Sequence, residues 1–518
     1  AVDGLAARVA RAPIDFDNLG GLSATTEPLL FVGAPAFYYG RDIEPGAQLR
    51  AYSFEDREVF PITDKVDAYA LAPSSKQVLV NQEGALSRFD LKKGEQEARK
   101  ADLDSLAARR VRADEYEQIF DEVWRRFRDH FYVENMHGYD WAALRDRYRP
   151  LLEHVAHRAD LNYLIGEMIA ELNVGHAYIA GGDIASTERS SDALLGATFE
   201  LDESAGLYRI ATIYAGQNEE DKYRSPLTEP GIDANPGDYV LAINGRLLTT
   251  DINPYSLLKG NGGRLLEVTL ADNARGKDRR TVLVNPIASE NDLLYLRWVA
   301  ENRARVTRET DGKIGYLHIP DMGAAGIYEF TKWFYGQVRK QGLIIDVRGN
   351  GGGNVSQMVI NRLARDLVFM GYDRGIDNLD TYPNVVFTGP LVALLDEDSA
   401  SDGDIFPGAF KAMELGPLIG KRSWGGIIGI TNLGSLMDGG SVFVPQFATA
   451  SADGQWTIEG VGVAPDIEVD NPPEAVLRGE DPQLERAIRE AVERLRTQPG
   501  TLPPRPADPV KTPSSGAP

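Results

Sequence analysis

Two loops of this chain carry residue types that could bind an anion or supply a nucleophile. The first, Gly-Asn-Gly-Gly-Gly at 349–353, follows an apolar strand expected at 343–347. A glycine run lets backbone N–H groups turn toward an anion, although such a run can equally be a flexible turn. A nucleotide site is not indicated, because the Lys-Ser/Thr pair of a P-loop and the last glycine of a dinucleotide fingerprint are missing.

The second loop, Ser399–Gly403, lies between an apolar strand expected at 391–395 and a helix expected at about 405–415. A serine on such a turn is placed as hydrolase nucleophiles often are, since the start of the helix favours developing negative charge. The alternative is that Ser401 or Asp402 only caps the helix. Open α/β sheets bind ligands at the carboxyl ends of their strands, so both loops are candidates for one site.

Histidine is the side chain that could activate this serine, because a neutral imidazole accepts a proton near pH 7. Of the six histidines, His176 lies on a Gly-preceded loop directly after a predicted helix. His318 lies in an apolar strand, where a hydrogen-bonded core role is expected. No two histidines have the spacing or neighbouring carboxylates of a metal site, so neither a metal nor another cofactor is expected. Taken alone, His176 could also be structural.

The composition is that of a large globular protein. The 518 residues suggest three or four domains at about 150 residues each, and the charged fraction of 25% is ordinary. The formal net charge of −22 argues against general binding to nucleic acid or anionic membrane. The absence of cysteine excludes a thiol nucleophile and disulfides. No apolar run reaches the ~18 residues of a membrane helix, and the missing initiator Met leads us to expect a fragment or a processed product.

The hydrophobic pattern divides the chain into regions of different class. Up to about residue 100, short apolar runs broken every ten residues or so predict the strands of a sandwich or of propeller blades. Apolar residues three and four apart predict a helix over 114–133 and another from an Asp160 cap to about 172. From about 186 to 290 the period is two, with a hairpin turn at Asn244-Gly245, which suits a small β-rich module.

Beyond about residue 310, strand–turn–helix repeats predict a sheet covered by helices. A last helix is expected to begin at Asp481-Pro482, and the proline-rich tail from Pro499 onward is expected to be disordered. The predicted fold class is therefore multidomain α+β.

Five motifs, in this order along the chain, resemble those of the tricorn protease family, within the class of tail-specific serine peptidases. They are Asn173–Tyr178, Asp346–Gly353, Ser401–Phe406, Trp424–Gly426 and Glu459–Asp466. The resemblance covers most of the chain from about 110 to 470. It implies a propeller-like β-rich segment over 1–105, a helical core subdomain with the catalytic histidine over 106–185, a PDZ-like domain over 186–295, an α/β serine peptidase domain over 296–480, and a C-terminal helix and tail over 481–518.

The resemblance implies a serine endopeptidase or oligopeptidase that works through an acyl-enzyme. Ser401 falls on the nucleophile, His176 on the general base and Glu459 on the acid that orients the histidine. The N–H groups of Gly353 and Asp402 fall on the oxyanion hole. These roles agree with the chemistry of the residues, because a serine hydroxyl needs a base and its tetrahedral intermediate needs two preset donors.

Further implications concern substrate and assembly. Asp373 falls on the aspartate that shapes the specificity pocket, which would favour a basic P1 residue. The family degrades oligopeptides as a hexamer, so peptide substrates and a homo-oligomer are expected. A cytoplasmic location is expected by family, with the periplasm as the alternative.

Two positions depart from the family pattern. Residue 175 is glycine where the family has a serine that relays between the histidine and the glutamate, and residue 460 is glycine where the family tends to have asparagine. Glu459 would then reach His176 directly, through water or through another hydroxyl. The lysine of the Ser–Lys relatives would fall at Gly426, so histidine is the better base. The alternative function is a non-catalytic PDZ-type peptide-binding scaffold with a vestigial site, which Gly175 favours.

Overall fold

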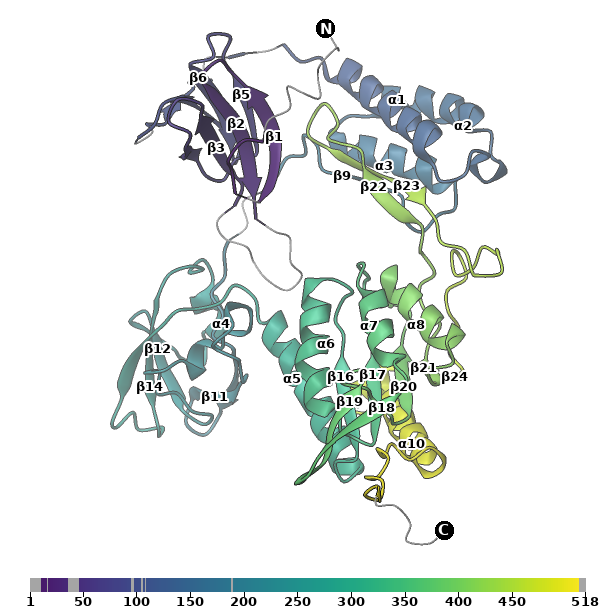
Figure 1. Ribbon diagram of the computed structural model, residues 1–518. Coiled ribbons are helices and arrows are strands. Elements are labelled where there is room, and N and C mark those ends of the chain that lie inside the picture. Colours follow the sequence, from purple (N-terminus) through teal and green to yellow (C-terminus); the bar gives the residue numbers. More distant parts are fainter. Residues whose placement is uncertain are drawn as a thin grey trace, which may run out of the picture. The chain divides into compact units, whose positions relative to one another are not determined.

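The structure is a computed structural model that describes residues 11–15, 17–35, 46–94, 97–103, 106–107, 109–187 and 190–511, without the side chains of 377–379. The chain divides into two compact units, Ala1–Arg112 and Ala113–Pro518. Figure 1 labels their helices and strands. Among the described residues, no helix combines the length and the apolar character needed to cross a bilayer.

The first unit contains two antiparallel sheets of four strands, ordered β1-β2-β3-β4 and β5-β6-β7-β8. The strands are β1 Asn18–Ala24, β2 Pro28–Ala34, β3 Gln48–Ser53, β4 Val59–Thr63, β5 Ala68–Leu71, β6 Gln77–Gln82, β7 Ala85–Asp90 and β8 Arg99–Lys100. Alternate residues such as Leu30, Leu49, Val78 and Val80 point into one shared core. Four-stranded antiparallel sheets are the units of propellers, and the predicted short strands are confirmed.

The second unit begins with a helical region made of α1 Arg112–His130, α2 Trp141–Tyr148 and α3 Arg158–Ala170. The apolar faces predicted for α1 and α3 pack on one another in a single core. The predicted Asp160 cap is wrong. His157 is the N-cap, and Asp160 is the third helical residue, whose carboxylate accepts from the His157 N–H at 3.2 Å. Aspartate suits both positions of a capping box, so the residue type alone could not choose between them.

The helical region is hydrogen-bonded, through one strand, to a segment near the C-terminal end of the chain. After α3 the chain forms β9 Tyr178–Ala180, which pairs antiparallel with β23 Ser441–Phe447, and β23 pairs with β22 Gly429–Asn432. His176 therefore lies two residues before a strand that is hydrogen-bonded to a segment some 265 residues further along the chain.

A small β-rich module follows, in the sheet order β10-β11-β12-β14-β15 with β13 paired to β12. Its elements are β10 Ala197–Asp202, β11 Leu207–Ile213, β12 Tyr239–Ile243, β13 Arg246–Leu247, α4 Pro254–Leu258, β14 Leu266–Ala271 and β15 Arg280–Val284. The predicted hairpin turn is confirmed, because Asn244 and Gly245 join β12 to β13 with φ of 49° and 70°. Both angles suit a type I′ turn, which only a few residue types adopt readily.

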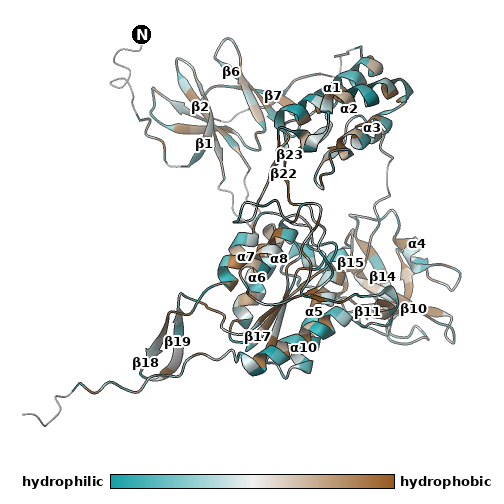
Figure 2. Cartoon of the chain, turned by 90° about the vertical axis from the view of Figure 1, so that its right-hand side faces the viewer, coloured by the Kyte–Doolittle hydropathy of each residue, from teal (hydrophilic) through white to brown (hydrophobic). Residues whose placement is uncertain are grey.

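The last region is a parallel five-stranded sheet in the order β16-β17-β20-β21-β24. The strands are β16 Ile314–His318, β17 Gly342–Asp346, β20 Leu391–Leu395, β21 Leu418–Gly420 and β24 Ile467–Glu468. The helices are α5 Asn291–Glu309, α6 Ala324–Gln337, α7 Ser356–Leu363, α8 Asp402–Ala412, α9 Pro473–Leu477 and α10 Pro482–Thr497. Figure 2 shows α5 and α10 on one face of the sheet and α6, α7 and α8 on the other.

This layered arrangement explains the continuous apolar runs of the central strands. Every residue of β17 and of β20 is buried, as expected for strands covered on both faces. Helix α10 begins after its Asp481 cap as predicted, whereas α8 begins at Asp402, three residues before the predicted start.

A separate hairpin, β18 Phe369–Asp373 with β19 Ile376–Tyr382, stands off from the sheet in Figure 2. The tail from Pro499 runs without helix or strand to residue 511, and the Tyr372 hydroxyl donates to the carbonyls of Pro503 and Pro504 at 3.2 Å. The rest of the tail that we expected to be disordered, residues 512–518, lies outside the described residues.

Candidate active site

Ser401 stands at the first turn of α8 in a conformation that serine seldom adopts. Its backbone has φ 58° and ψ −122°, and its side chain makes no capping hydrogen bond. A non-glycine residue in this region carries a conformational cost, and such residues concentrate at functional sites. The cap interpretation of Ser401 is therefore not realised, and its hydroxyl is left available at the start of the helix.

Asp402 does not cap the helix either. Its carboxylate is buried and accepts from the backbone N–H of Ser356 at 2.9 Å and from the Ser356 hydroxyl. This contact fastens the start of α8 to the start of α7.

The glycine loop lies directly against the serine. A Cβ at position 352 would lie 2.5 Å from the Cβ of Ser401, and φ at Gly352 is +96°, so a side chain is excluded both by space and by backbone conformation. The buried Asn350 fixes this approach: its carbonyl accepts from Ala400 N–H at 2.8 Å and its side-chain oxygen from Gly352 N–H at 3.0 Å. The two loops found in the sequence are thus one structure.

Two backbone amides beside the serine are free. Within the described part of the chain, neither the N–H of Gly353 nor that of Asp402 has an acceptor. Gly353 pairs with Met322 in an isolated parallel bridge, and a Cβ on Gly353 would lie 2.0 Å from the Met322 carbonyl oxygen. Unpaired amide donors on two adjoining loops are what an oxyanion requires.

His176 is half-buried and contacts two aromatic rings. Its ring centroid lies 5.0 Å from that of Trp424 and 5.9 Å from that of Tyr178. Its Nδ1 is buried and has no partner among the described residues. Burial lowers the pKa of His176 below its ordinary value, although the carboxylates of Glu459 and Asp404 act in the opposite direction.

The Trp424 loop connects the histidine to the serine. Trp424 N–H donates to the Ser399 carbonyl at 3.0 Å, and Asp404 in α8 accepts from Gly425 N–H at 2.8 Å and Gly426 N–H at 3.2 Å. Asp404 is fully buried, and this burial raises its pKa against the hydrogen bonds it accepts. No hydrogen bond joins Ser401 and His176 in the described structure; the Trp424 loop contacts the His176 ring and is bonded to the Ser399 carbonyl and to Asp404 in α8.

Glu459 contacts the backbone around His176 and not the imidazole. Its Oε1 accepts from Gly175 N–H at 2.9 Å, and its Oε2 accepts from Ile427 N–H at 2.7 Å and Ile428 N–H at 3.1 Å. The carboxylate therefore clamps the residue before the histidine to the segment that follows Trp424.

Asp373 is not brought to the other candidate residues. It is exposed at the end of β18, where its side chain accepts from Arg374 N–H and its carbonyl accepts from Arg505 at 2.7 Å. In the part of the chain that the structure describes, no contact joins it to the loops that carry Ser401 and His176.

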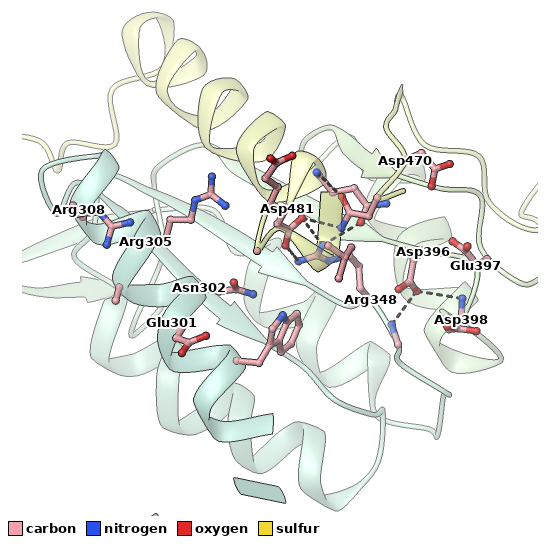
Figure 3. Close-up of a pocket in the computed structure, with 18 residues that line it drawn as sticks. Glu301, Asn302, Arg305, Arg308, Arg348, Asp396, Glu397, Asp398, Asp470 and Asp481 are labelled. Carbon is pink, nitrogen blue, oxygen red and sulfur yellow. Dashed lines mark hydrogen bonds and ion pairs between the residues drawn. The ribbon is translucent and has the colours of Figure 1, made fainter. Parts of the chain in front are cut away.

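A separate polar hollow of about 740 Å³ lies on the side of α5 and α10 (Figure 3). Asp396 forms part of its wall and accepts from Gly349 N–H at 2.9 Å, so the hollow lies behind the glycine loop. Arg348 in the same wall is held by Asp346 and Asp481. Neither Ser401 nor His176 lines this hollow. The described residues contain no group of three or more His, Asp and Glu side chains suited to a metal ion.

Sequence reasoning gave no role to Asn350, Asp404 or Trp424. All three belong to motifs quoted above, and a buried polar residue beside a glycine run was the only available signal. His318, by contrast, is confirmed as a core histidine, because it is buried and its Nε2 lies 2.9 Å from the Arg348 carbonyl.

Three parts of the chain match the models of known protein families. Residues 112–170 match the tricorn protease C1 domain, residues 193–289 the tricorn protease PDZ domain, and residues 313–469 peptidase family S41. The chain is built like the C-terminal half of a tricorn protease. Its last region, residues 313–469, is similar to peptidase family S41.

Proteins that align with almost the whole chain show the same similarity to tricorn proteases. Tricorn protease homolog 1 of Streptomyces coelicolor is 34% identical over 97% of this chain and 48% of its own length. Tricorn protease of Thermoplasma acidophilum is 34% identical over 92% of this chain and 44% of its own length. The crystal structure of the tricorn protease superposes with a TM-score of 0.83 at 31% identity, over 93% of this chain and 47% of that one. The chain thus spans about half the length of the relatives it matches.

Proposed function

We propose that this chain is a serine peptidase that hydrolyses peptides through an acyl-enzyme, with Ser401 as nucleophile and His176 as general base. The observation that carries the proposal is the conformation of Ser401 at the start of α8: its φ is positive and its side chain makes no capping hydrogen bond. Beside it, the backbone amides of Gly353 and Asp402 have no acceptor among the described residues. A nucleophile with two preset donors beside it is the minimum that acyl transfer needs.

In the proposed reaction, His176 Nε2 takes the proton of the Ser401 hydroxyl while its oxygen attacks the peptide carbonyl carbon. The carbonyl oxygen becomes an oxyanion held by the Gly353 and Asp402 amides, and losing one such donor typically costs about 3–4 kcal/mol of barrier. The imidazolium then protonates the leaving amine, which departs and leaves an ester on Ser401. Water, deprotonated by the same imidazole, hydrolyses that ester.

The pKa of His176 suits this role. Because burial lowers that pKa, the imidazole stays neutral and able to accept a proton at neutral and mildly acidic pH. Glu459 is proposed as the orienting acid of the site, acting on the backbone at Gly175.

Three finer assignments are proposals on the strength of the family. Asp373 would select a basic P1 residue, the chain would act as a homo-oligomer, a hexamer by resemblance, and its location would be the cytoplasm, with the periplasm as the alternative. The domain limits expected from the sequence are proposed with them, supported by the three family-model matches. An Asp373→Asn variant should lose the preference for basic P1 residues, and light scattering on the purified chain measures the oligomer.

A fluorogenic peptide with Arg or Lys before the scissile bond tests the function. Turnover by the wild-type chain should vanish in Ser401→Ala and in His176→Ala. Equal rates in all three proteins, or none in any, would favour the alternative of a non-catalytic PDZ-type peptide-binding scaffold, which Gly175 and the unpartnered Nδ1 of His176 support.

A further inference from the structure

The imidazole of His176 lacks the hydrogen bond that usually orients a catalytic histidine. When Nε2 accepts the serine proton, Nδ1 must carry a hydrogen, and in the described structure that buried atom has no acceptor. Something other than a bond at Nδ1 must therefore hold the ring.

The nearby carboxylates are already committed to backbone amides. Both oxygens of Glu459 accept from N–H groups, at Gly175 on one side and at Ile427 and Ile428 on the other. Asp404 accepts from Gly425 and Gly426. These two carboxylates and the phenol of Tyr178 are the titratable groups that act on or contact the imidazole in the described residues.

The closest ring to the imidazole is the indole of Trp424. Its centroid lies 5.0 Å from the imidazole centroid with 50° between the planes, within the range of favourable aromatic contacts. The backbone that carries the indole is anchored, because the Trp424 backbone N–H donates to the carbonyl of Ser399, two residues before the nucleophile, and the next two backbone amides donate to Asp404.

Two glycines make room for this indole. A Cβ on Gly426 would lie 2.2 Å from a Trp424 ring carbon, and a Cβ on Gly175 would lie 3.1 Å from another. Neither glycine has a positive φ, so the backbone there would accept a side chain. The indole in its present position therefore leaves no room for a side chain at position 426, and at position 175 a Cβ would be in tight contact with the indole and with the Cα of Gly426 at 3.1 Å.

We propose that Trp424 is the positioning residue of His176: its indole, admitted by Gly175 and Gly426, holds the imidazole toward Ser401 in place of a hydrogen bond at Nδ1. This inference rests on the proposed function. It explains how a chain with glycine at position 175 keeps an oriented base, since ring packing requires only space and a rigid support. It also explains why the Trp-Gly-Gly segment is bonded to both the serine loop and α8.

The test compares kcat, KM and the pH profile of peptide hydrolysis in the wild type, Trp424→Ala, Trp424→Phe and Gly426→Ala. Trp424→Ala should lower kcat about 10- to 100-fold, because small misplacements of a catalytic group have effects of that size, with KM within about twofold. Its acid limb should move to higher pH, because water then reaches the imidazole and relieves its desolvation. Trp424→Phe should recover most of kcat.

Gly426→Ala keeps the indole but displaces it, so the same loss of kcat and the same shift of the acid limb are expected even if Trp424→Ala folds poorly. Tyr163→Ala removes a ring that is 71% exposed on α3 and should leave all three quantities unchanged.

Two results overturn the inference while the proposed function stands, provided that the wild type is active and Ser401→Ala silences it. In the first, Trp424→Ala keeps the wild-type kcat and acid limb. In the second, Trp424→Ala lowers the rate equally at every pH and Trp424→Phe recovers none of it. A wild type with no turnover, or one that Ser401→Ala leaves active, overturns the proposed function itself, and the inference with it.

Discussion

Replacing Glu459 with glutamine tests whether the carboxylate acts through the backbone before His176. The carboxylate accepts three N–H groups, one at Gly175 and two at Ile427 and Ile428. A glutamine has only one oxygen, and it loses least if that oxygen serves the two isoleucine amides, so its NH₂ group then faces the Gly175 N–H. The lost bond is thus the one that fixes the residue before the base.

The magnitude follows from that single bond. An unsatisfied, partly buried amide costs about 1–3 kcal/mol, and at 1.4 kcal/mol per factor of ten this corresponds to a kcat loss of about 5- to 150-fold if the cost falls on the transition state. The assay is steady-state peptide hydrolysis, with Glu468→Gln as control, since the Glu468 side chain is 75% exposed. A Glu459→Gln enzyme with wild-type kcat, or an equal loss in the control, would refute this reasoning.

Three further predictions concern the base, the serine loop and the core. Because burial lowers the pKa of His176, activity should persist as the pH falls to 6.5, and the acid limb of kcat/KM should lie below that value; a limb at or above 6.5 contradicts the assignment. Gly352→Ala should lower kcat at least about 100-fold, because its Cβ would lie 2.5 Å from that of the nucleophile, whereas Gly351→Ala, with open space around it, should retain activity in the same assay. Arg348→Met should cost about 3–5 kcal/mol of unfolding free energy in denaturant titration, since it leaves the buried Asp346 carboxylate without its guanidinium; an unchanged midpoint would remove that ion pair from the account.

Much of the fold could be predicted because its signals are local. Buried parallel strands are continuous apolar runs, and β17 and β20 were placed within one residue on that basis. The Asn244-Gly245 turn needs residues that accept positive φ, and the sequence supplies them. The first residues of helices were harder to predict. At α8, for example, the motif at the start of the helix could be interpreted either as a loop or as a helix cap.

The sequence identified the residues of the candidate site but not the contacts that they make. Ser401, His176 and Glu459 were found as members of motifs, yet nothing in the spacing says that Glu459 would bind backbone amides or that Nδ1 would lack a partner. Those facts depend on the meeting of segments about 250 to 280 residues apart, and loop geometry sets them. Asp373 is the opposite case: a residue placed by motif that has no described contact with the rest of the site.

Covalent labelling of the nucleophile is the most direct test of the proposed chemistry. A fluorophosphonate transfers its phosphonyl group to an activated serine oxygen with loss of fluoride, and the adduct is located by mass spectrometry of the digested chain. The wild type should carry one adduct, on Ser401, formed much more slowly in His176→Ala and absent in Ser401→Ala. Labelling at another residue, or at equal rates in all three proteins, would contradict the claim that His176 activates Ser401.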